Sequence, residues 1–463
     1  MDSSDNKAEK NKEERKYIAD FTRGNVAKQL VKFATPLFLS SLLQIVYNMV
    51  DMIIVGQKLG KVGLSAVSVG GDVTSFLTFV AMGFGNAGQI IISQYIGSGQ
   101  KDKISRFIGT MMCFLLGSGA MISIICLLLR TPILSLMNTP PEAFSEANAY
   151  ATVTLTGLIF IYGYNVMSAV LRGMGDSIRP FIFIAIAAVG NIVLDILFVI
   201  GLGMGSEGAA LATVISQAFS FIACSVYIYR NKQRYELTLT RDELLGIDKD
   251  MLQSLIKLGT PMAIKYASIH LSKMFVNAYV NSYGVAVSAF AGIANKMSSI
   301  VNTLSNSFNT AGASMIGQNI GAGNYDRVGK IMKSDYSITV SLATVFSLLI
   351  FLFPKEFYGL FTSEPDVIEI GVKFVPIAIV LFYGSAARSG MNALINGSGN
   401  YKVNFATAIL DGIVFRIGFA LLFGLGLGMK HYGFWLGDAL AGFTPLWIGL
   451  VFYYSGAWKK RSV

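Results

Sequence analysis

Long apolar segments separated by short polar connections make up most of the chain. Twelve of these segments, as helices, are long enough to cross a hydrocarbon layer of ~30 Å. Their approximate ranges are 33–57, 62–97, 104–129, 145–171, 178–203 and 207–229 in the first half, and 254–283, 287–320, 334–353, 367–395, 403–427 and 433–455 in the second. The pattern predicts an all-α integral membrane protein with twelve transmembrane helices.

The two sets of six segments repeat one another at an offset of 224 to 225 residues. Residues 33–36 recur at 258–261, residues 94–99 at 318–323, and residues 173–176 at 397–400. Because each set holds an even number of spans, both sets enter the membrane with the same orientation, which makes them parallel repeats. We therefore expect two pseudo-symmetric six-helix lobes, with substrate sites between them.

Polar stretches divide the chain into five expected regions. These are a disordered cytoplasmic tail at 1–16, an N-lobe at 17–230, a cytoplasmic inter-lobe loop at 231–250, a C-lobe at 251–457 and a cytoplasmic C-terminal tail at 458–463. The first region mixes basic with acidic residues and lacks an apolar stretch, so we expect no removable signal peptide.

Composition and charge agree with a membrane protein, because 53% of the residues are hydrophobic and only 14% are charged. Of the 37 Lys and Arg residues, 26 fall on the side that holds the termini. The positive-inside rule therefore predicts a multi-pass protein of the cell membrane with both termini in the cytoplasm. The net charge of +10 follows this topology and not a basic soluble surface, so we expect no nucleic-acid partner.

Motifs for enzymatic chemistry are missing from the sequence. Residues 83–88 and 203–208 match GxGxxG, but neither opens a helix after a predicted strand. There is no GxSxG, HExxH or Walker loop. The three cysteines lie in apolar runs without metal-type spacing. We expect a protein that is not an enzyme and that needs no cofactor.

Polar side chains inside the apolar segments carry the candidate chemistry. Asn191 and Asp195 are four residues apart and share one face of the fifth span. At ~1.5 Å per residue, Asp51 lies about 27 Å from the inner end of the first span and Asp195 about 25 Å from that of the fifth. Thr213 lies about 9 Å inside the outer end of the sixth span. These four residues can therefore meet in the outer half of the N-lobe.

The four side chains are open to three interpretations. Two carboxylates, an amide and a hydroxyl form an all-oxygen set that suits a hard cation such as Na⁺. Two close carboxylates can instead share a proton and act as a proton carrier. A protonated Asp195 that only hydrogen-bonds a neighbouring helix is the structural alternative. The sequence leaves Na⁺ and H⁺ open as the coupling ion.

The chain resembles the multidrug and toxic compound extrusion (MATE) transporters, and within them the DinF-like bacterial and archaeal branch. The resemblance covers all twelve spans and rests on Pro36 and on the segments 47–51, 93–97, 171–176 and 191–195. It implies a two-lobed exporter of twelve helices that exchanges drugs for Na⁺ or H⁺.

The resemblance also assigns roles to residues of the first half. The family's first-lobe cation site carries over onto Asp51, Asn191, Asp195 and Thr213. Its proline-dependent bending of the first helix carries over onto Pro36. The cation site thus falls on the same four residues that depth in the membrane selects.

The second half departs from the acid-rich pattern of the NorM-like branch. Its seventh span carries Lys265, His270 and Lys273, and its eighth carries Lys296 where the repeat places Asp72. Lys273 and Lys296 can face a central cavity, where they would partner acidic residues or an anionic substrate group. A separate cation site in the C-lobe is therefore not assured by the resemblance.

Charged residues near the end of the chain complete the candidate set. Asp411 and Arg416 are five residues apart and can form an ion pair, and Asp438 occupies the repeat position of Thr213. The candidate cavity or substrate-binding residues are Asp72, Lys273, Lys296, Arg388, Asp411 and Asp438.

These features favour a secondary active antiporter that exports amphipathic organic compounds, expected to be cationic, in exchange for Na⁺ or H⁺. Its expected partners are small organic molecules and the lipid bilayer, and it is expected to be a monomer. The alternative is a flippase of the same superfamily for lipid-linked oligosaccharide or peptidoglycan precursors, which would favour basic cavity residues such as Lys273, Lys296 and Arg388. A membrane enzyme would need a catalytic set that the sequence lacks.

Overall fold

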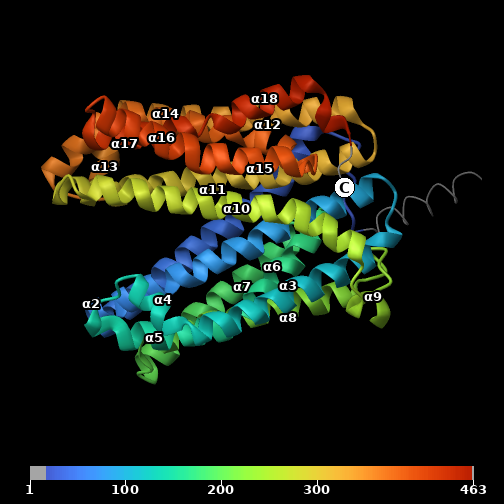
Figure 1. The fold of residues 1–463 in the computed structure, drawn as a ribbon, viewed down its shortest axis with the longest axis horizontal. Coiled ribbons are helices and arrows are strands. Elements are labelled where there is room, and N and C mark those ends of the chain that lie inside the picture. The colour runs from blue at the N-terminus through green and yellow to red at the C-terminus, as the bar shows by residue number, and fades with distance from the viewer. Residues whose placement is uncertain (1–16, 461–463) are drawn as a thin grey trace, which may run out of the picture. The chain divides into compact units, whose positions relative to one another are not determined.

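The computed structural model describes residues 17–460, and these residues form helices joined by short turns (Figure 1). No strand occurs among them, which confirms the all-α prediction. The predicted tail at 1–16 and the last three residues, 461–463, lie outside the described part of the chain.

The first half of the chain contains nine helical elements. They are α2 (Val26–Gly97), α3 (Asp102–Leu128), α4 (Arg130–Leu136), α5 (Pro141–Thr156), α6 (Leu158–Gly173), α7 (Ile178–Asp195), the π-helix η1 (Ile196–Gly201), α8 (Gly205–Arg230) and α9 (Arg241–Leu245).

The second half begins with the long helix α10 (Lys249–Asn281). It is followed by α11 (Val285–Gly321), α12 (Tyr325–Leu352), α13 (Pro354–Gly359), α14 (Pro365–Gly397), α15 (Tyr401–Ile409), the π-helix η2 (Leu410–Val414), α16 (Phe415–Leu421), the π-helix η3 (Leu422–Gly426), α17 (Lys430–Ala441), α18 (Thr444–Ser455) and the short 3₁₀ helix η4 (Ala457–Lys459).

Every predicted span corresponds to helical structure in the described residues. Helix α2 contains the first two spans in 72 residues and is interrupted at Gly60, whose φ of 60° and ψ of −149° only glycine adopts easily. Eight of the described helices, with α2 counted once, are long and apolar enough to cross a membrane, and the α5–α6 pair, bent by 46°, makes a ninth. Helices α10 and α11 have the required length but carry lysines: the partly buried Lys265 and Lys273 in α10 and the exposed Lys296 in α11.

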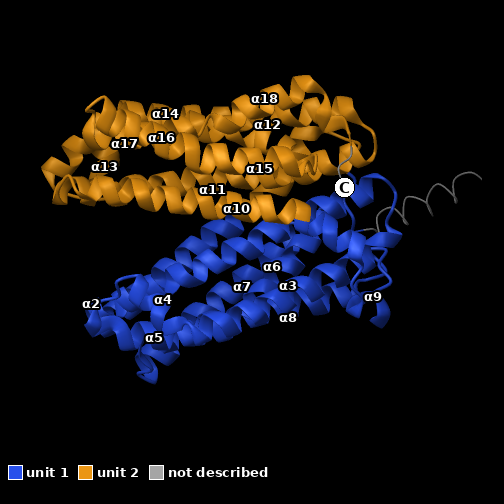
Figure 2. Cartoon of the chain, in the orientation of Figure 1, with its two compact units in different colours: residues 1–20, 39–256 blue, residues 21–38, 257–463 orange. Residues whose placement is uncertain are grey.

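The chain divides into two compact units (Figure 2). Among the described residues, unit 1 comprises 17–20 and 39–256, and unit 2 comprises 21–38 and 257–460. The start of α2 therefore belongs to unit 2, because the chain changes units within this helix, after Phe38. This assignment differs from the expected N-lobe, which was contiguous from residue 17.

Unit 1 is built around helix α8, which packs against α5, α6 and α7. The inter-lobe loop also belongs to this unit and is held by specific contacts. Tyr235 is fully buried, and its hydroxyl donates to Asp176 at 2.7 Å. Burial and the adjacent Asp176 carboxylate raise the pKa of Tyr235. A salt bridge of 3.2 Å joins Asp248 to Arg106, so the loop is anchored at both ends.

Unit 2 is built around helix α14, which packs against α11, α12, α17 and α18. Its largest core cluster joins aromatic side chains, including Phe290, Phe374 and Trp435, whose ring centroids lie 5.2 to 5.4 Å apart. Helices α16 and α17 approach backbone to backbone, since a Cβ added at Gly437 would lie 2.4 Å from the nitrogen of Ala420. This close approach brings the polar residues of the two helices within reach of one another.

Candidate cation-binding site

Helix α7 presents one apolar face and one face with two polar side chains. Val189 and Val193 are 65% and 59% exposed, as expected of positions that face lipid. Asn191 and Asp195 lie on the opposite face and are almost completely buried. The polar pair therefore points into unit 1. The helix changes to π geometry directly after Asp195, a feature that is frequent at functional sites.

Helix α2 supplies the second carboxylate of the site. Asp51 is buried, and its carboxyl lies within hydrogen-bond reach of the Asp195 carboxyl. Two carboxyls can hydrogen-bond to each other only when one of them holds a proton, because an ionised carboxylate only accepts. Among residues 17–460, no other donor reaches either oxygen of Asp195. A proton or another cation at this pair would supply the missing partner.

A small pocket lies beside this carboxylate pair and is formed by helices α2, α7 and α8. It is lined by Tyr47, Ile184, Ala187, Ala188, Asn191, Thr213, Ser216 and Gln217. The structure therefore brings Asn191 and Thr213 to one pocket and Asp51 and Asp195 to one carboxyl pair. The two sets are joined because Asn191 lies one turn from Asp195 on the same face of α7.

Oxygen atoms dominate the polar lining of the pocket. The side-chain oxygens of Asn191, Ser216 and Gln217 are buried and have no hydrogen-bond partner within the described residues. Such atoms are rare in native proteins, so several in one place call for an explanation. Together with the carboxylates they fit a proton or a small hard cation, which prefers oxygen ligands.

Three residues of this site were missed in the sequence. Tyr47 lies one turn before Asp51, and Ser216 and Gln217 lie three and four residues after Thr213. The Tyr47 hydroxyl meets the Gln217 side chain by a hydrogen bond, which links α2 to α8 across the pocket. Each of these residues lies three or four positions from Asp51 or Thr213 and therefore on the same helix face. This spacing is the sequence signal that could have identified them.

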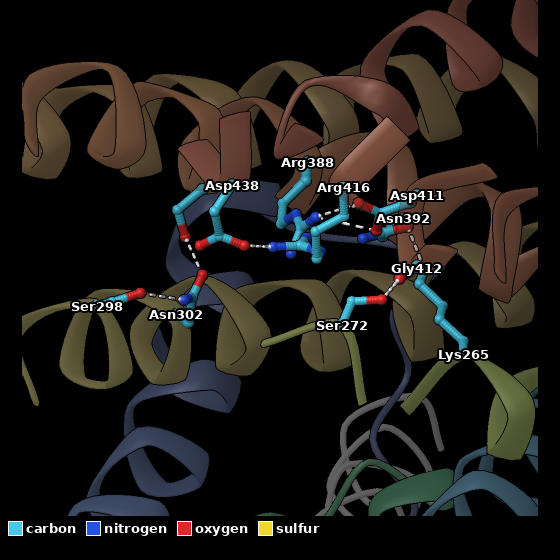
Figure 3. A network of polar contacts seen from close by, with 11 residues as sticks. Lys265, Ser272, Ser298, Asn302, Arg388, Asn392, Asp411, Gly412, Arg416 and Asp438 are labelled. Atoms are coloured by element: carbon cyan, nitrogen blue, oxygen red, sulfur yellow. Dashed lines mark hydrogen bonds and ion pairs between the residues drawn. The ribbon is translucent and has the colours of Figure 1, made fainter. Parts of the chain in front are cut away.

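A second polar cluster lies within unit 2 (Figure 3). Nη2 of Arg388 donates to both carboxylate oxygens of Asp411, at 2.8 and 2.9 Å. Arg416 donates to the same carboxylate at 3.2 Å and also pairs with Asp438. Lys265 donates to the amide oxygen of Asn392 at 2.6 Å. The ion pair expected from the spacing of Asp411 and Arg416 is therefore present.

The remaining predicted residues lie in different settings. Lys273 is half-buried and is attracted to Asp438. Asp72 and Lys296 are exposed, the first in unit 1 and the second in unit 2. Helix α2 continues through Pro36, two residues before the point where the chain changes units. Bending at Pro36 stays a prediction.

The described part of the chain contains no group of three or more His, Cys, Asp or Glu side chains that could hold a metal ion. Any cation in unit 1 would instead be held by two carboxylates with amide and hydroxyl oxygens.

Buried ionisable groups within long apolar helices mark a functional site in a membrane protein, and often an ion or substrate pathway. The MatE family model matches residues 36–197 and again residues 261–422. The chain belongs to this family, which makes it a multi-pass membrane transporter of small molecules and not an enzyme. The two matches coincide with the internal repeat.

Individual relatives extend over nearly the whole chain. The probable multidrug resistance protein YpnP of Bacillus subtilis is 31% identical, with 96% of this chain and 98% of the relative covered. The probable multidrug resistance protein NorM of Thermotoga maritima is 26% identical over 95% of this chain and 94% of its own. A solved MOP superfamily transporter from Pyrococcus furiosus matches with a TM-score of 0.87 at 23% identity, over 95% of this chain and 98% of that one. This last likeness concerns the fold.

Proposed function

We propose that this protein is a multidrug efflux antiporter that exports amphipathic organic compounds, cationic ones among them, in exchange for Na⁺ or H⁺. The observation that supports this most directly is the buried Asp51–Asp195 carboxyl pair, in which neither Asp195 oxygen has a hydrogen-bond partner among the described residues. Relatives of the chain are named as multidrug resistance proteins, which supports the substrate class. The coupling ion would bind at Asp51, Asn191, Asp195 and Thr213.

The coupling follows from the cost of burying charge. An ionised Asp51–Asp195 pair within membrane-spanning helices is costly unless a cation neutralises it. A proton or Na⁺ would therefore stabilise the conformation in which this site is closed, and the organic substrate would stabilise another. One monovalent cation that enters down ~100 mV releases about 2.3 kcal/mol, enough for a roughly 50-fold gradient of a neutral substrate.

The proposal also covers the oligomeric state of the protein, its membrane and its orientation there, and a hinge in helix α2. We infer a monomer in the cell membrane with both termini in the cytoplasm, as the distribution of Lys and Arg indicates. Pro36 would act as the hinge of α2, because proline removes one backbone hydrogen bond inside the helix. Its position close to the change of units supports this role.

The proposal is tested by efflux of ethidium from proteoliposomes under an imposed Na⁺ or H⁺ gradient. Wild-type protein should export ethidium under one of the two gradients, and Asp51→Asn and Asp195→Asn should each lose that dependence. Asp102→Asn is the matched control, because Asp102 is an exposed acid of the same unit. Full gradient-driven efflux by both site variants would refute the coupling role.

A second candidate function is the flippase for lipid-linked precursors. The observation that favours it is the surplus of basic side chains in unit 2, which suits phosphate groups. Folded wild-type protein that exports no ethidium under either gradient would support this candidate. Translocation of a lipid-linked precursor in the same liposomes would then be measured.

A further inference from the structure

The polar cluster of unit 2 contains more positive than negative side chains. Its cations are Lys265, Lys273, Arg388 and Arg416, and its acids are Asp411 and Asp438. All six belong to helical segments that cross or line the membrane-spanning part of the unit. With every group ionised, the cluster carries a formal surplus of two positive charges.

The salt bridges pair both acids with arginines, so the surplus positive charge lies on the two lysines. Asp411 is shared by Arg388 and Arg416, and Asp438 is already paired with Arg416 (Figure 3). Lys265 reaches only a neutral amide oxygen, that of Asn392. Lys273 is attracted to Asp438 but makes no hydrogen bond to a described residue. Lys273 therefore has no counter-ion of its own.

Unused hydrogen-bond donors accompany this charge. The Nε–H groups of Arg388 and Arg416 are buried and find no acceptor in residues 17–460. A buried donor without an acceptor is costly, and more so when it belongs to a cation. One anionic group can satisfy such donors and the surplus charge together, with charge-assisted hydrogen bonds.

The cluster is reachable from one edge. Asp411 is fully buried, whereas the side chains of Asp438 and Arg388 are 18% and 13% exposed and Lys273 is half-buried. A ligand would therefore approach the cluster from the edge formed by Lys273 and Asp438.

We propose that Lys273, together with Arg388 and Arg416, forms a binding site for the carboxylate group of the transported amphiphile. This inference rests on the proposed export function and narrows its substrate class. Preferred substrates carry a carboxylate, and zwitterions that combine it with a cationic group are included. Purely cationic amphiphiles would bind without this interaction.

Rhodamine B and its ethyl ester form a matched pair of probes, because they differ only in whether the carboxylate is free. Their binding to purified full-length protein in detergent micelles is measured by fluorescence anisotropy. Wild-type protein should bind the acid at least about ten-fold more tightly than the ester. Equal affinity for the two probes would overturn the proposal without the use of any variant.

Variants locate the effect at Lys273. Lys273→Gln should reduce the preference for the acid to within about two-fold, and Lys273→Arg should restore it because it keeps the positive charge. Lys257→Gln is the matched control, since Lys257 is an exposed lysine of the same helix α10. Wild-type preference in a Lys273→Gln protein that elutes as a folded monodisperse species would also overturn the proposal.

The binding assay separates this inference from the export function. Carboxylate preference without ethidium antiport would preserve the site and refute the antiporter. Ethidium antiport without carboxylate preference would preserve the antiporter and refute the site.

Discussion

Unit 1 buries the Asp51–Asp195 carboxyl pair beside other oxygens, whereas unit 2 buries Asp411 beside guanidinium groups. Asp195 finds only the Asp51 carboxyl and has no donor among the described residues. Asp411 accepts hydrogen bonds from two arginines at 2.8 to 3.2 Å. The charge of Asp411 is therefore compensated by cations of the protein, whereas Asp195 has no cationic partner among the described residues.

The repeat places different chemistry at the equivalent positions of unit 2. At the offset of 225 residues, which also relates Thr213 to Asp438, Asn191 and Asp195 correspond to Arg416 and Ala420. All four residues are buried. Where unit 1 has an amide and a carboxylate, unit 2 therefore has a guanidinium that pairs with Asp411 and Asp438, and a small apolar residue.

The largest effect on stability is expected in unit 2. Asp411→Asn removes the shared partner of Arg388 and Arg416 and leaves buried guanidinium charge without compensation. Loss of one partner from a buried ion pair costs about 3–5 kcal/mol. Thermal unfolding of the purified protein in detergent should therefore show a strong decrease in stability.

Asp326→Asn provides the control for this experiment, because Asp326 is an exposed acid of the same unit. Its effect should stay within about 0.5 kcal/mol. If Asp411→Asn proved as mild as this control, the salt-bridge network would not be what stabilises unit 2.

The same substitution in unit 1 should have a much smaller effect. Asp195→Asn removes a carboxylate that has no cationic partner, and the new amide can donate to Asp51. The stability in the absence of coupling ion should change by no more than about 1 kcal/mol. Any ligand that binds only the folded state adds stability, so Na⁺ or added acid should raise the unfolding temperature of the wild type more than that of the variant.

A large loss of stability in Asp195→Asn would contradict this contrast, because it would make Asp195 a structural residue like Asp411. If Na⁺ and pH changed the unfolding temperature of the wild type and the variant equally, Asp195 would have no role in ion binding. Asp102→Asn again serves as the control, with no change in either response.

Spacing along the helices explains most of what the sequence predicted correctly. Asn191 and Asp195 share a helix face because they are four residues apart. Asp411 and Arg416 are five residues apart, which is also close enough for the predicted ion pair. The twelve spans followed from apolar length alone. The place where α2 changes units had no such signal, because it depends on which helices surround residues 21–38.

The features that the sequence did not predict depend on long-range contacts and on where helices begin. The Arg388–Asp411 pair joins α14 to η2 across 23 residues, and nothing in either segment indicates the partner. The span predicted at 334–353 would place Asp335 at its edge. The structure begins α12 at Tyr325, so Asp335 lies well inside the helix and is fully buried. The apolar pattern predicts the burial of a polar residue near a helix end only as precisely as it predicts where that helix begins or ends.

The smallest expected effect concerns a third kind of carboxylate, one that is supplied with neutral donors. Glu243 in the inter-lobe loop accepts from the backbone nitrogen of Thr240 at 2.9 Å and from the Thr238 hydroxyl at 2.7 Å, in a capping box at the start of α9. Partial burial opposes its ionisation, but these hydrogen bonds outweigh it and lower the pKa of Glu243. The loop should therefore be most stable above the ordinary glutamate pKa and should loosen as the pH falls through the lowered value.

Glu243→Gln should weaken this cap by roughly 0.5 kcal/mol and remove its pH dependence, because the amide does not ionise. Hydrogen–deuterium exchange of a peptide covering residues 238–246 measures the effect without unfolding the protein. Faster exchange in the variant at neutral pH, with convergence on the wild type in acid, is the expected result. An unchanged difference between the two proteins at every pH would mean that shape, and not charge, makes Glu243 a good cap. In that case the hydrogen-bond donors around Glu243 would not control its ionisation. The lack of donors at Asp195 would then not explain its different role.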